Sequence, residues 1–393
     1  MLYLDCTGIY NCPQRHTGIQ RVTRNIAKEA LNISNDVRLT VLDSSGKFYT
    51  IDAIPFFLRM LYNIFILNKR SKPMRHLLID TDTGSDDAVA LIAALREPSV
   101  KVEAITTVCG NVPLPLATNN ALISIAMANT YQPPVYVGAD KPLYRALYTA
   151  ENVHGDDGLG DMHYPVPPIP VSSGFAPDVI LEYVRKFPNE LEIVTLGPAT
   201  NIALAIQKDT TTMAKVKRIY SMGTGGFGPG NVTPVAEFNV YVDAEAYKIM
   251  LESGIPITIA GFDLCLGDAA LTRSDIAILK SSVDPAAVFA VDCNRVLITY
   301  NQKRSGQEII DLPDPVAMAI ALWPNVIAEQ LPCHCYVCTI EEPAYGQVIL
   351  DYGQNPPTSH VLSTNAPNAM VVKTIQNTLF KEKLLQALTM QAK

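Results

Sequence analysis

The sequence has little of several features that mark common classes of protein. Charged residues make up only 18% of the chain, and no run of Lys and Arg is long enough to follow a nucleic-acid backbone. Eight cysteines in 393 residues do not make a disulfide framework, and no charged-then-apolar leader opens the sequence, so we expect a reducing cytoplasm. The longest apolar patch, Phe56–Leu67, contains Arg59 and Asn63 and is too short to cross a bilayer of ~30 Å. We therefore expect no nucleic acid and no membrane as partners.

What the sequence does have is a regular alternation of two patterns. Hydrophobic residues make up 48% of the chain, which lets it bury a large core. From His76 onward, apolar β-branched runs alternate with segments of helical periodicity. This rhythm predicts an α/β fold, with an open and mostly parallel sheet flanked by helices. The expected strands are His76–Thr81, Val102–Val108, Val135–Val137, Leu191–Leu196, Val216–Met222 and Pro256–Ala260. The expected helices are Asp86–Arg96, Leu116–Asn129, Pro177–Lys186, Ala199–Gln207 and Ala244–Glu252.

The two ends of the chain depart from this rhythm. After Ala317, short alternating runs at Tyr336–Ile340 and Gln347–Leu350, then a helix near Lys373–Leu388, predict a sheet extension or flanking hairpin. The first 72 residues end in a basic, turn-prone stretch at Asn68–Pro73, which suits a boundary. We therefore predict an N-terminal appendage at residues 1–72 and one domain at 73–393.

The segment Tyr3–Ile26, with LDCTG and TGIQRVTRNI, resembles the opening strand, loop and helix of some family-four-type glycosyltransferases. Only about one structural unit of such a domain is present. A working transferase needs more, so the segment is interpreted as an appended fragment or a gene-boundary artefact, without activity of its own.

The main chemical signal is a group of four carboxylates within eight residues. A buried strand is expected to end at Asp80 and Asp82, and a helix to begin near Asp86 and Asp87. Such charges repel one another unless a cation or shared protons relieve them. Hard oxygen ligands without nearby His or Cys favour Ca²⁺ or Mg²⁺ over Zn²⁺. Gly84 permits a tight turn, and the helix N-terminus favours negative charge. The alternative is that Asp86 and Asp87 only cap the helix.

Two other segments resemble ligand-binding motifs at first sight, but each lacks part of the motif. The run CHCYVC at Cys333–Cys338 matches no common zinc finger and alternates like a strand, which favours buried or surface thiols. The run TGGFGPG at Thr224–Gly230 lacks the Lys-Ser/Thr that follows a phosphate loop. We interpret it as a mobile loop leading to Asn231.

The carboxylate segment also carries a family resemblance. Asp80–Leu91 (DTDTGSDDAVAL) is similar to the DxDPGxDDAxAL signature of the inosine–uridine nucleoside hydrolase family, with Thr83 where the family usually has Pro. The resemblance spans about residues 74–390. It continues in the family's order through TTVCGN (Thr106–Asn111), NNA (Asn119–Ala121), HGDDGLG (His154–Gly160), GPATNIALA (Gly197–Ala205), GNVTPVAEFN (Gly230–Asn239), DAEA (Asp243–Ala246) and LPDPVAMA (Leu312–Ala319).

This resemblance implies a nucleoside hydrolase fold with a Rossmann-like core, and hydrolysis of the N-glycosidic bond of ribonucleosides. It implies Ca²⁺ as cofactor, a small-molecule nucleoside as substrate, and a homodimer or homotetramer. In this family resemblance, Asp82 has two implied roles, as a metal ligand and as the general base that takes a proton from water. The metal ligands carried over by motif are Asp82, Asp87, Asp314 and the carbonyl of Thr200. The carried-over ribose ligands are Asp86, Asn239 and Asn111, with Asn231 and Glu237 at the 5′-hydroxyl and Asp80 in support.

The side of the site that faces the departing base differs from well-studied members. Where they carry His or Trp before the late metal-binding Asp, this chain has Pro313, and Leu266 stands where some show a His. His154 remains a candidate catalytic residue, or a local hydrogen-bonding group. Tyr300 and Arg304 resemble pocket-lining positions of the family. We expect the enzyme to act on bases that leave readily, or to use Tyr300, Arg304 or solvent as donor.

Two other functions fit parts of the sequence. A haloacid-dehalogenase-like phosphatase would use Asp80 of the DTDT run as a covalent nucleophile. It gives no reason for Asp86, Asp87 or the later motifs. A non-catalytic nucleoside- or ribose-binding relative would keep the metal site and lose turnover.

Overall fold

The computed structural model describes residues 38–42, 48–52, 74–340, 342–353 and 365–389. The chain divides into two units, Met1–Pro73 and Met74–Lys393. In the first unit, β1 (Arg38–Leu42) and β2 (Phe48–Asp52) pair as antiparallel strands. The glycosyltransferase-like segment and the apolar patch at Phe56–Leu67 lie outside the described residues, so the interpretations given for them stay predictions.

The second unit is built on a nine-stranded sheet with the order β10-β9-β11-β8-β7-β6-β3-β4-β5. The strands from β11 to β5 pair in parallel, while β9 and β10 form an antiparallel hairpin at one edge. This is the mostly parallel α/β sheet that the sequence predicts, and the tail does extend it. The strand bounds are β3 Arg75–Thr81, β4 Val100–Thr107, β5 Val135–Val137, β6 Leu191–Thr195, β7 Arg218–Met222, β8 Ile257–Ala260, β9 Ile327–Val337, β10 Val348–Asp351 and β11 Ala369–Ile375.

The connections place a topological switch point between β3 and β6. From β3 the chain adds β4 and β5 on one side, and later β6, β7 and β8 on the other. Loops that leave two neighbouring strands in opposite directions open a crevice at the carboxyl edge, where ligands bind in sheets of this kind. Asp82 directly follows β3 and Gly197 follows β6, so the predicted site residues start from this crevice.

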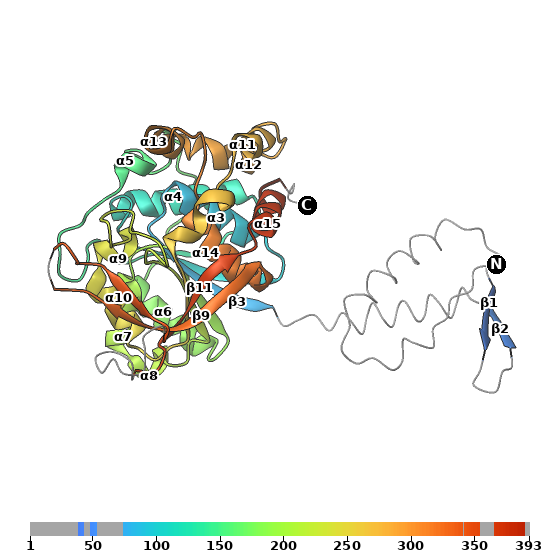
Figure 1. Ribbon diagram of the computed structural model, residues 1–393, viewed down its shortest axis with the longest axis horizontal. Helices are drawn as coiled ribbons and strands as arrows, with labels where there is room; N and C mark the ends of the chain where they lie inside the picture. Colours follow the sequence, from blue (N-terminus) through green and yellow to red (C-terminus); the bar gives the residue numbers. More distant parts are fainter. Residues whose placement is uncertain (1–37, 43–47, 53–73, 341, 354–364, 390–393) are drawn as a thin grey trace. The chain divides into compact units, whose positions relative to one another are not determined.

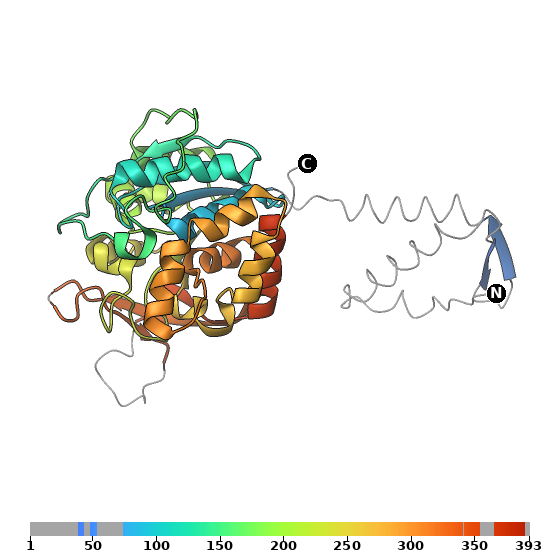
Figure 2. The same cartoon turned by 90° about the horizontal axis from the view of Figure 1, so that it is seen from above.

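Helices cover both faces of the sheet (Figures 1 and 2). Alternating side chains of β3 divide between two cores: Leu77 and Ile79 pack with α3, α4, α12, α14 and α15, while Leu78 packs with α6, α7 and α10. The helix bounds are α3 Ser85–Arg96, α4 Leu114–Ala128, α5 Glu151–His154, α6 Ala176–Lys186, α7 Thr200–Lys208, α8 Thr210–Met213, α9 Phe238–Val242, α10 Ala244–Leu251, α11 Arg273–Lys280, α12 Pro285–Asp292, α13 Arg295–Ser305, α14 Pro313–Leu322 and α15 Asn377–Thr389.

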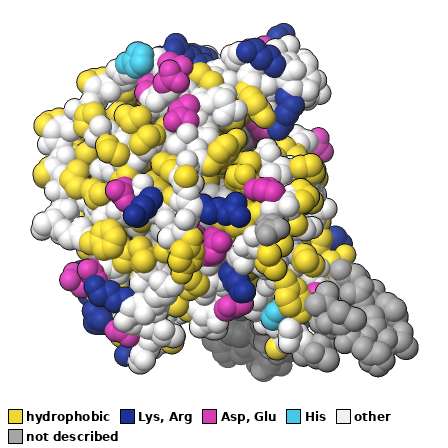
Figure 3. Space-filling view, turned by 90° about the vertical axis from the view of Figure 1, so that its left-hand side faces the viewer, with side chains coloured by type: hydrophobic (Ala, Val, Ile, Leu, Met, Phe, Trp, Pro, Cys, Tyr) yellow, Lys and Arg dark blue, Asp and Glu magenta, His cyan; other side chains and the backbone are white. Residues whose placement is uncertain are grey.

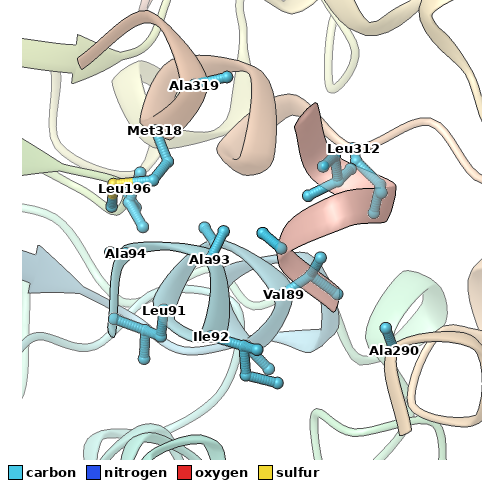
Figure 4. Packing of buried hydrophobic residues seen from close by; sticks show 14 of the residues in the cluster. Val89, Leu91, Ile92, Ala93, Ala94, Leu196, Ala290, Leu312, Met318 and Ala319 are labelled. Atoms are coloured by element: carbon cyan, nitrogen blue, oxygen red, sulfur yellow. The ribbon is translucent and has the colours of Figure 1, made fainter. Parts of the chain in front are cut away.

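Helix α3 is buried along its whole length and packs against α14. Figure 4 shows Val89 and Ala93 of α3 facing the segment that carries Leu312, Met318 and Ala319. Small alanine side chains let the two helices approach closely, and the segment Ala88–Leu95 of α3, which is apolar on every side, has to be enclosed. As a result, the first turns of α3 and α14, which carry Asp86, Asp87 and Asp314, come together in the protein interior.

The sequence-based element positions are largely confirmed. The strands predicted from β3 to β8 and the five predicted helices match the structure within two residues at each end. The expectation that a helix begins near Lys373 is wrong, because β11 continues to Ile375 and α15 begins only at Asn377.

The exposed surface is chemically mixed on the face shown in Figure 3. Lys and Arg side chains lie there in small separate groups, among Asp and Glu side chains and between apolar ones. Among the described residues, no helix combines the length and the apolar character needed to cross a membrane.

Candidate active site

Four buried carboxylates meet at the switch point. Asp82 leaves β3, Asp86 and Asp87 lie in the first turn of α3, and Asp314 lies in the first turn of α14. Each is at most 3% exposed. Asp86, Asp87 and Asp314 each offer one oxygen, and these oxygens all lie within 4.8 Å of one another. Two helix N-termini face this group, and their dipoles favour negative charge there.

Asp87 is fixed by several donors. Its Oδ1 accepts from the Thr81 hydroxyl at 2.6 Å, and its Oδ2 accepts from the Gly84 main-chain N–H at 2.8 Å. The Asn111 side-chain amide also donates to Asp87 Oδ2, at 3.0 Å. Asp86 accepts a longer bond from the Asp314 main-chain N–H, at 3.4 Å. The turn around Gly84 therefore aims the carboxylates before any ligand binds.

Asp82 has one satisfied and one unsatisfied oxygen. Its Oδ2 accepts from the Asn111 main-chain N–H at 2.7 Å, but its buried Oδ1 has no hydrogen-bond partner in the protein. Two glycines make room for this carboxylate, because a Cβ on Gly110 would lie 2.0 Å from Oδ2 and one on Gly197 would lie 2.6 Å from Oδ1. A buried carboxylate oxygen left in this way is costly unless a cation or proton satisfies it.

The electrostatics of the cluster also favour a cation. Burial raises the pKa of Asp82, Asp86 and Asp314 above the usual range of a carboxyl group, and the charges of neighbouring aspartates raise it further. A divalent ion bound among these groups would offset both effects, because its positive charge stabilises each ionised carboxylate. The donor set is hard oxygen, and the orphaned Asp82 Oδ1 offers an additional oxygen, so these residues fit an ion of the Ca²⁺ or Mg²⁺ class.

Asp80, at the end of β3, connects the elements next to the carboxylate cluster through hydrogen bonds. Its Oδ1 accepts from the Thr106 hydroxyl at 2.5 Å and from the Asn201 side-chain amide at 2.8 Å. Burial raises the pKa of Asp80 to about 6. Asn201 also donates to the Thr107 carbonyl at 3.0 Å, so these bonds connect the ends of β3 and β4 to α7.

A pocket of about 260 Å³ opens in front of the carboxylates. One part of its lining is amide and carboxyl: Asn111, Asn231, Glu237 and Asn239. Asn239 donates to the Leu196 carbonyl at 2.6 Å, and Asn231 accepts from the Phe238 main-chain N–H at 2.8 Å. Glu237 caps α9 by accepting from the N–H groups of Asn239 and Val240, and burial raises the pKa of its carboxyl to about 7.

His154, at the end of α5, has a defined tautomer. Its Nδ1 accepts from the Ser85 main-chain N–H at 3.2 Å and lies 3.0 Å from the Ser85 hydroxyl. An imidazole nitrogen that accepts an N–H bond carries no proton, so in the neutral ring the proton is on Nε2. Burial lowers the pKa of His154 to about 4, against an opposing effect of Asp87. The residue therefore offers a neutral N–H rather than a charged acid.

Helix α13 and the start of α14 form another part of the lining. Tyr300 and Arg304 lie there as the sequence predicts, together with Pro313. Asn301 and Asp311 also line the pocket, although the sequence did not point to them. Asp311 is 3% exposed and binds Arg304 at 3.0 Å. Tyr148, Phe238 and Phe262 also line the pocket and were missed, since a single aromatic residue gives no signal in the sequence that it faces a pocket.

The predicted site residues thus gather in one place. Nine of them line the pocket, namely Asp86, Asn111, His154, Asn231, Glu237, Asn239, Tyr300, Arg304 and Asp314. Asp82 and Asp87 are buried beside them. Thr200 begins α7 at the same edge of the sheet, and its hydroxyl donates to Asp243 at 2.7 Å. The individual roles assigned to these residues stay predictions.

The two segments first considered for other ligands have simpler roles. Cys333 and Cys335 are buried free thiols of β9. Residues 224–230 form an irregular loop that leads to Asn231, and Asp263 accepts from the Phe227 N–H in that loop at 2.9 Å.

A mostly parallel sheet with buried carboxylates and a polar pocket at its switch point is the arrangement of an α/β enzyme whose site can hold a divalent cation. Comparison with known proteins agrees. Residues 77–382 match the family model described as inosine-uridine preferring nucleoside hydrolase. A pyrimidine-specific ribonucleoside hydrolase, RihA of Salmonella agona, is 34% identical over 79% of this chain and 97% of its own length.

Solved structures give the same result. A plant nucleoside hydrolase, PpNRh1, superposes with a TM-score of 0.77 at 31% identity, covering 81% of this chain and all of its own. A purine-preferring ribonucleoside hydrolase from Gardnerella vaginalis gives a TM-score of 0.72 at 27% identity, covering 80% of this chain and 98% of its own. The chain therefore belongs to the inosine-uridine preferring nucleoside hydrolase family. It is an enzyme that hydrolyses the N-glycosidic bond of ribonucleosides. Its family membership favours this function over the phosphatase and the non-catalytic binding protein considered above.

Proposed function

We propose that the enzyme releases free base and ribose with Ca²⁺ held by Asp82, Asp87, Asp314 and the carbonyl of Thr200. When bound, the cation supplies charge neutralisation and lowers the pKa of water in the site. Asp82 is the general base and takes a proton from the attacking water. The free Oδ1 of Asp82 supports this role, because no donor of the protein occupies the lone pairs that would receive the proton.

The ribose is held by groups that accept and donate at fixed angles. Asp86 and Asn239 bind ribose hydroxyls, Asn111 assists, and Asn231 with Glu237 holds the 5′-hydroxyl. All five side chains line the pocket. One oxygen of Asp86 also lies within 4.8 Å of oxygens of Asp87 and Asp314, so Asp86 would help to hold a cation bound there as well as the ribose.

His154 completes the pocket as a neutral donor. Its Nδ1 is engaged by Ser85, which leaves Nε2–H for the substrate. This geometry supports a hydrogen bond to the nucleoside and not the transfer of a proton from imidazolium. The residue then helps to orient the substrate as water approaches the sugar.

The observation that carries the proposal is the convergence of oxygens of Asp86, Asp87 and Asp314 within 4.8 Å, together with the buried Asp82, whose Oδ1 has no hydrogen-bond partner in the protein. The test measures ribose released from purine and pyrimidine nucleosides, with and without a Ca²⁺ chelator. The wild type should lose turnover with chelator and recover it with Ca²⁺, whereas Asp82→Asn should stay inactive in both states. A matched control is Asp178→Asn, which changes a surface carboxylate paired with Lys208 and should keep full activity.

The base preference needs the same panel. The named relatives include a pyrimidine-specific and a purine-preferring hydrolase, so the rate of ribose release should be compared between purine and pyrimidine nucleosides at equal concentration. The cytoplasmic location and the homodimer or homotetramer expected from the sequence stay predictions. Light scattering on the purified enzyme measures the latter.

A further inference from the structure

The part of the pocket formed by α13 and α14 contains one fixed positive charge. Of the described residues that line the pocket, Arg304 is the only Lys or Arg, while Asp86, Glu237, Asp311 and Asp314 are acidic. Its side chain is 41% exposed, so the guanidinium can be reached from the pocket. A guanidinium stays charged at any working pH and presents five N–H donors.

Asp311 holds this cation and an amide at the same time. Its Oδ2 accepts from Arg304 at 3.0 Å, and its Oδ1 accepts from the side-chain amide of Asn301. The bond to Arg304 uses one guanidinium nitrogen, which leaves further N–H donors for a ligand. Asp311 is 3% exposed, and a carboxylate so deeply buried is held in one orientation by such partners.

The amide of Asn301 points to a ligand independently. Its Nδ2 donates to Asp311 and, at 3.3 Å, to the Ile309 carbonyl. Both partners only accept, so the amide orientation is fixed and Oδ1 faces away from them. That oxygen is buried without a partner, on a residue that lines the pocket. A buried unsatisfied acceptor is costly, and an N–H group of a bound base would satisfy it.

We propose that Arg304, positioned by Asp311, stabilises the negative charge that develops on the departing nucleobase, and that Asn301 accepts a hydrogen bond from that base. The role falls to this group because Pro313 has no donor at the position beside Asp314. The inference rests on the nucleoside hydrolysis proposed above and adds its base-side catalytic residue.

The step balances without an acid on the protein. The electron pair of the C1′–N bond moves to the base, and the charge spreads onto its ring nitrogens and any carbonyl oxygens, where the guanidinium N–H groups donate to it. The water oxygen bonds to C1′, and its proton goes to Asp82. The released base takes a proton from solvent, and Asp82 later returns its own proton to solvent. Electrostatic stabilisation of this kind acts on charge that forms only as the bond breaks, so it affects kcat more than KM.

The test compares leaving groups that differ in their need for stabilisation. Uridine and inosine release basic leaving groups, whereas p-nitrophenyl β-D-ribofuranoside releases a stable phenolate. Arg304→Met should lower kcat on the nucleosides by about 30-fold or more while KM changes by less than about threefold. On the p-nitrophenyl riboside the same variant should lose less than about threefold. Arg304→Lys, which keeps the charge without the planar fork, should recover part of the loss.

Two further variants separate a structural effect. Arg304→Met leaves the buried Asp311 without its cation, so the double variant Arg304→Met with Asp311→Asn removes both charges and should fold while showing the same selective loss. Lys303→Met changes the neighbouring exposed cation, which does not line the pocket, and should behave as wild type. An equal loss on nucleosides and on the p-nitrophenyl riboside, or a loss confined to KM, would overturn the inference. Absence of turnover by the wild type on every substrate would instead overturn the proposed function.

Discussion

The main-chain N–H of Asn111 donates to Asp82 Oδ2 at 2.7 Å, and the other oxygen of that carboxylate has no partner. One bond thus fixes the orientation of the proposed base and leaves its second oxygen available. The same Asn111 reaches Asp87 through its side chain, so the loop after β4 sets the geometry of both carboxylates.

Replacement of Asp82 by Asn should separate activity from stability. The variant keeps an acceptor for Asn111 but cannot take a proton, so we expect kcat to fall by about 10²–10⁴-fold. Removing one of several buried like charges should also raise the Tm of the metal-free protein by about 2–6 °C. Ribose release and a thermal melt with chelator measure the two effects. A metal-free variant less stable than wild type would contradict the repulsion inferred here.

Calcium should stabilise the fold through the same cluster. A ligand that binds only the folded state adds about 2.7 kcal/mol at a concentration of 100 Kd, so the Tm should rise with added Ca²⁺. Asp314→Asn should reduce this rise strongly, since it removes one of the three converging carboxylates. The surface variant Asp178→Asn serves as control. A rise of the same size in Asp314→Asn would place the stabilising ion elsewhere.

Glu237 should make stability depend on pH. Its pKa is raised by burial from 4.5 to about 7. Because the folded value is the higher one, its contribution is present in full below pH about 4.5 and is lost as the pH rises through about 7. Between pH 5 and pH 8, the free energy of unfolding of wild type relative to Glu237→Gln should therefore fall by about 2–3 kcal/mol. Urea melts at the two pH values test this, and parallel pH dependence in both proteins would be the contrary result.

Gly197 should be required for the orientation of Asp82. A Cβ at this position would lie 2.6 Å from Asp82 Oδ1, so Gly197→Ala should displace the carboxylate and lower kcat at least about 10-fold. Gly223, which follows β7, is a matched control, because a Cβ there meets the ring of Tyr247 and not a proposed catalytic group. Gly223→Ala should lower the Tm but leave kcat close to that of the wild type. Similar effects of the two variants on kcat would argue against the role of Gly197.

The sequence allowed most of the fold and the carboxylate cluster of the site to be predicted, for identifiable reasons. Asp82, Asp86 and Asp87 stand in one short segment between a strand and a helix, so local geometry already brings them together. The strands from β3 to β8 are apolar runs between clear turns. Strand β11, by contrast, is followed almost directly by α15, and its place beside β8 depends on long-range pairing that periodicity does not show.

The base side of the pocket was less predictable. Asn301 and Asp311 lie on either side of the turn at Gly306, and their contact depends on how α13 folds back towards α14. Neither residue has a motif around it that indicates a ligand. The two hydrogen bonds by which Asp311 connects Asn301 to Arg304 become visible only when the burial and hydrogen bonds of each atom are known.

The most direct test of the central claim is a calcium titration of the chelator-treated enzyme, with bound calcium and ribose release measured on the same samples. The gathering of carboxylates from β3, α3 and α14 predicts one high-affinity ion per chain, with turnover rising in proportion to its occupancy. Full ribose release from protein that carries no bound divalent metal would contradict it.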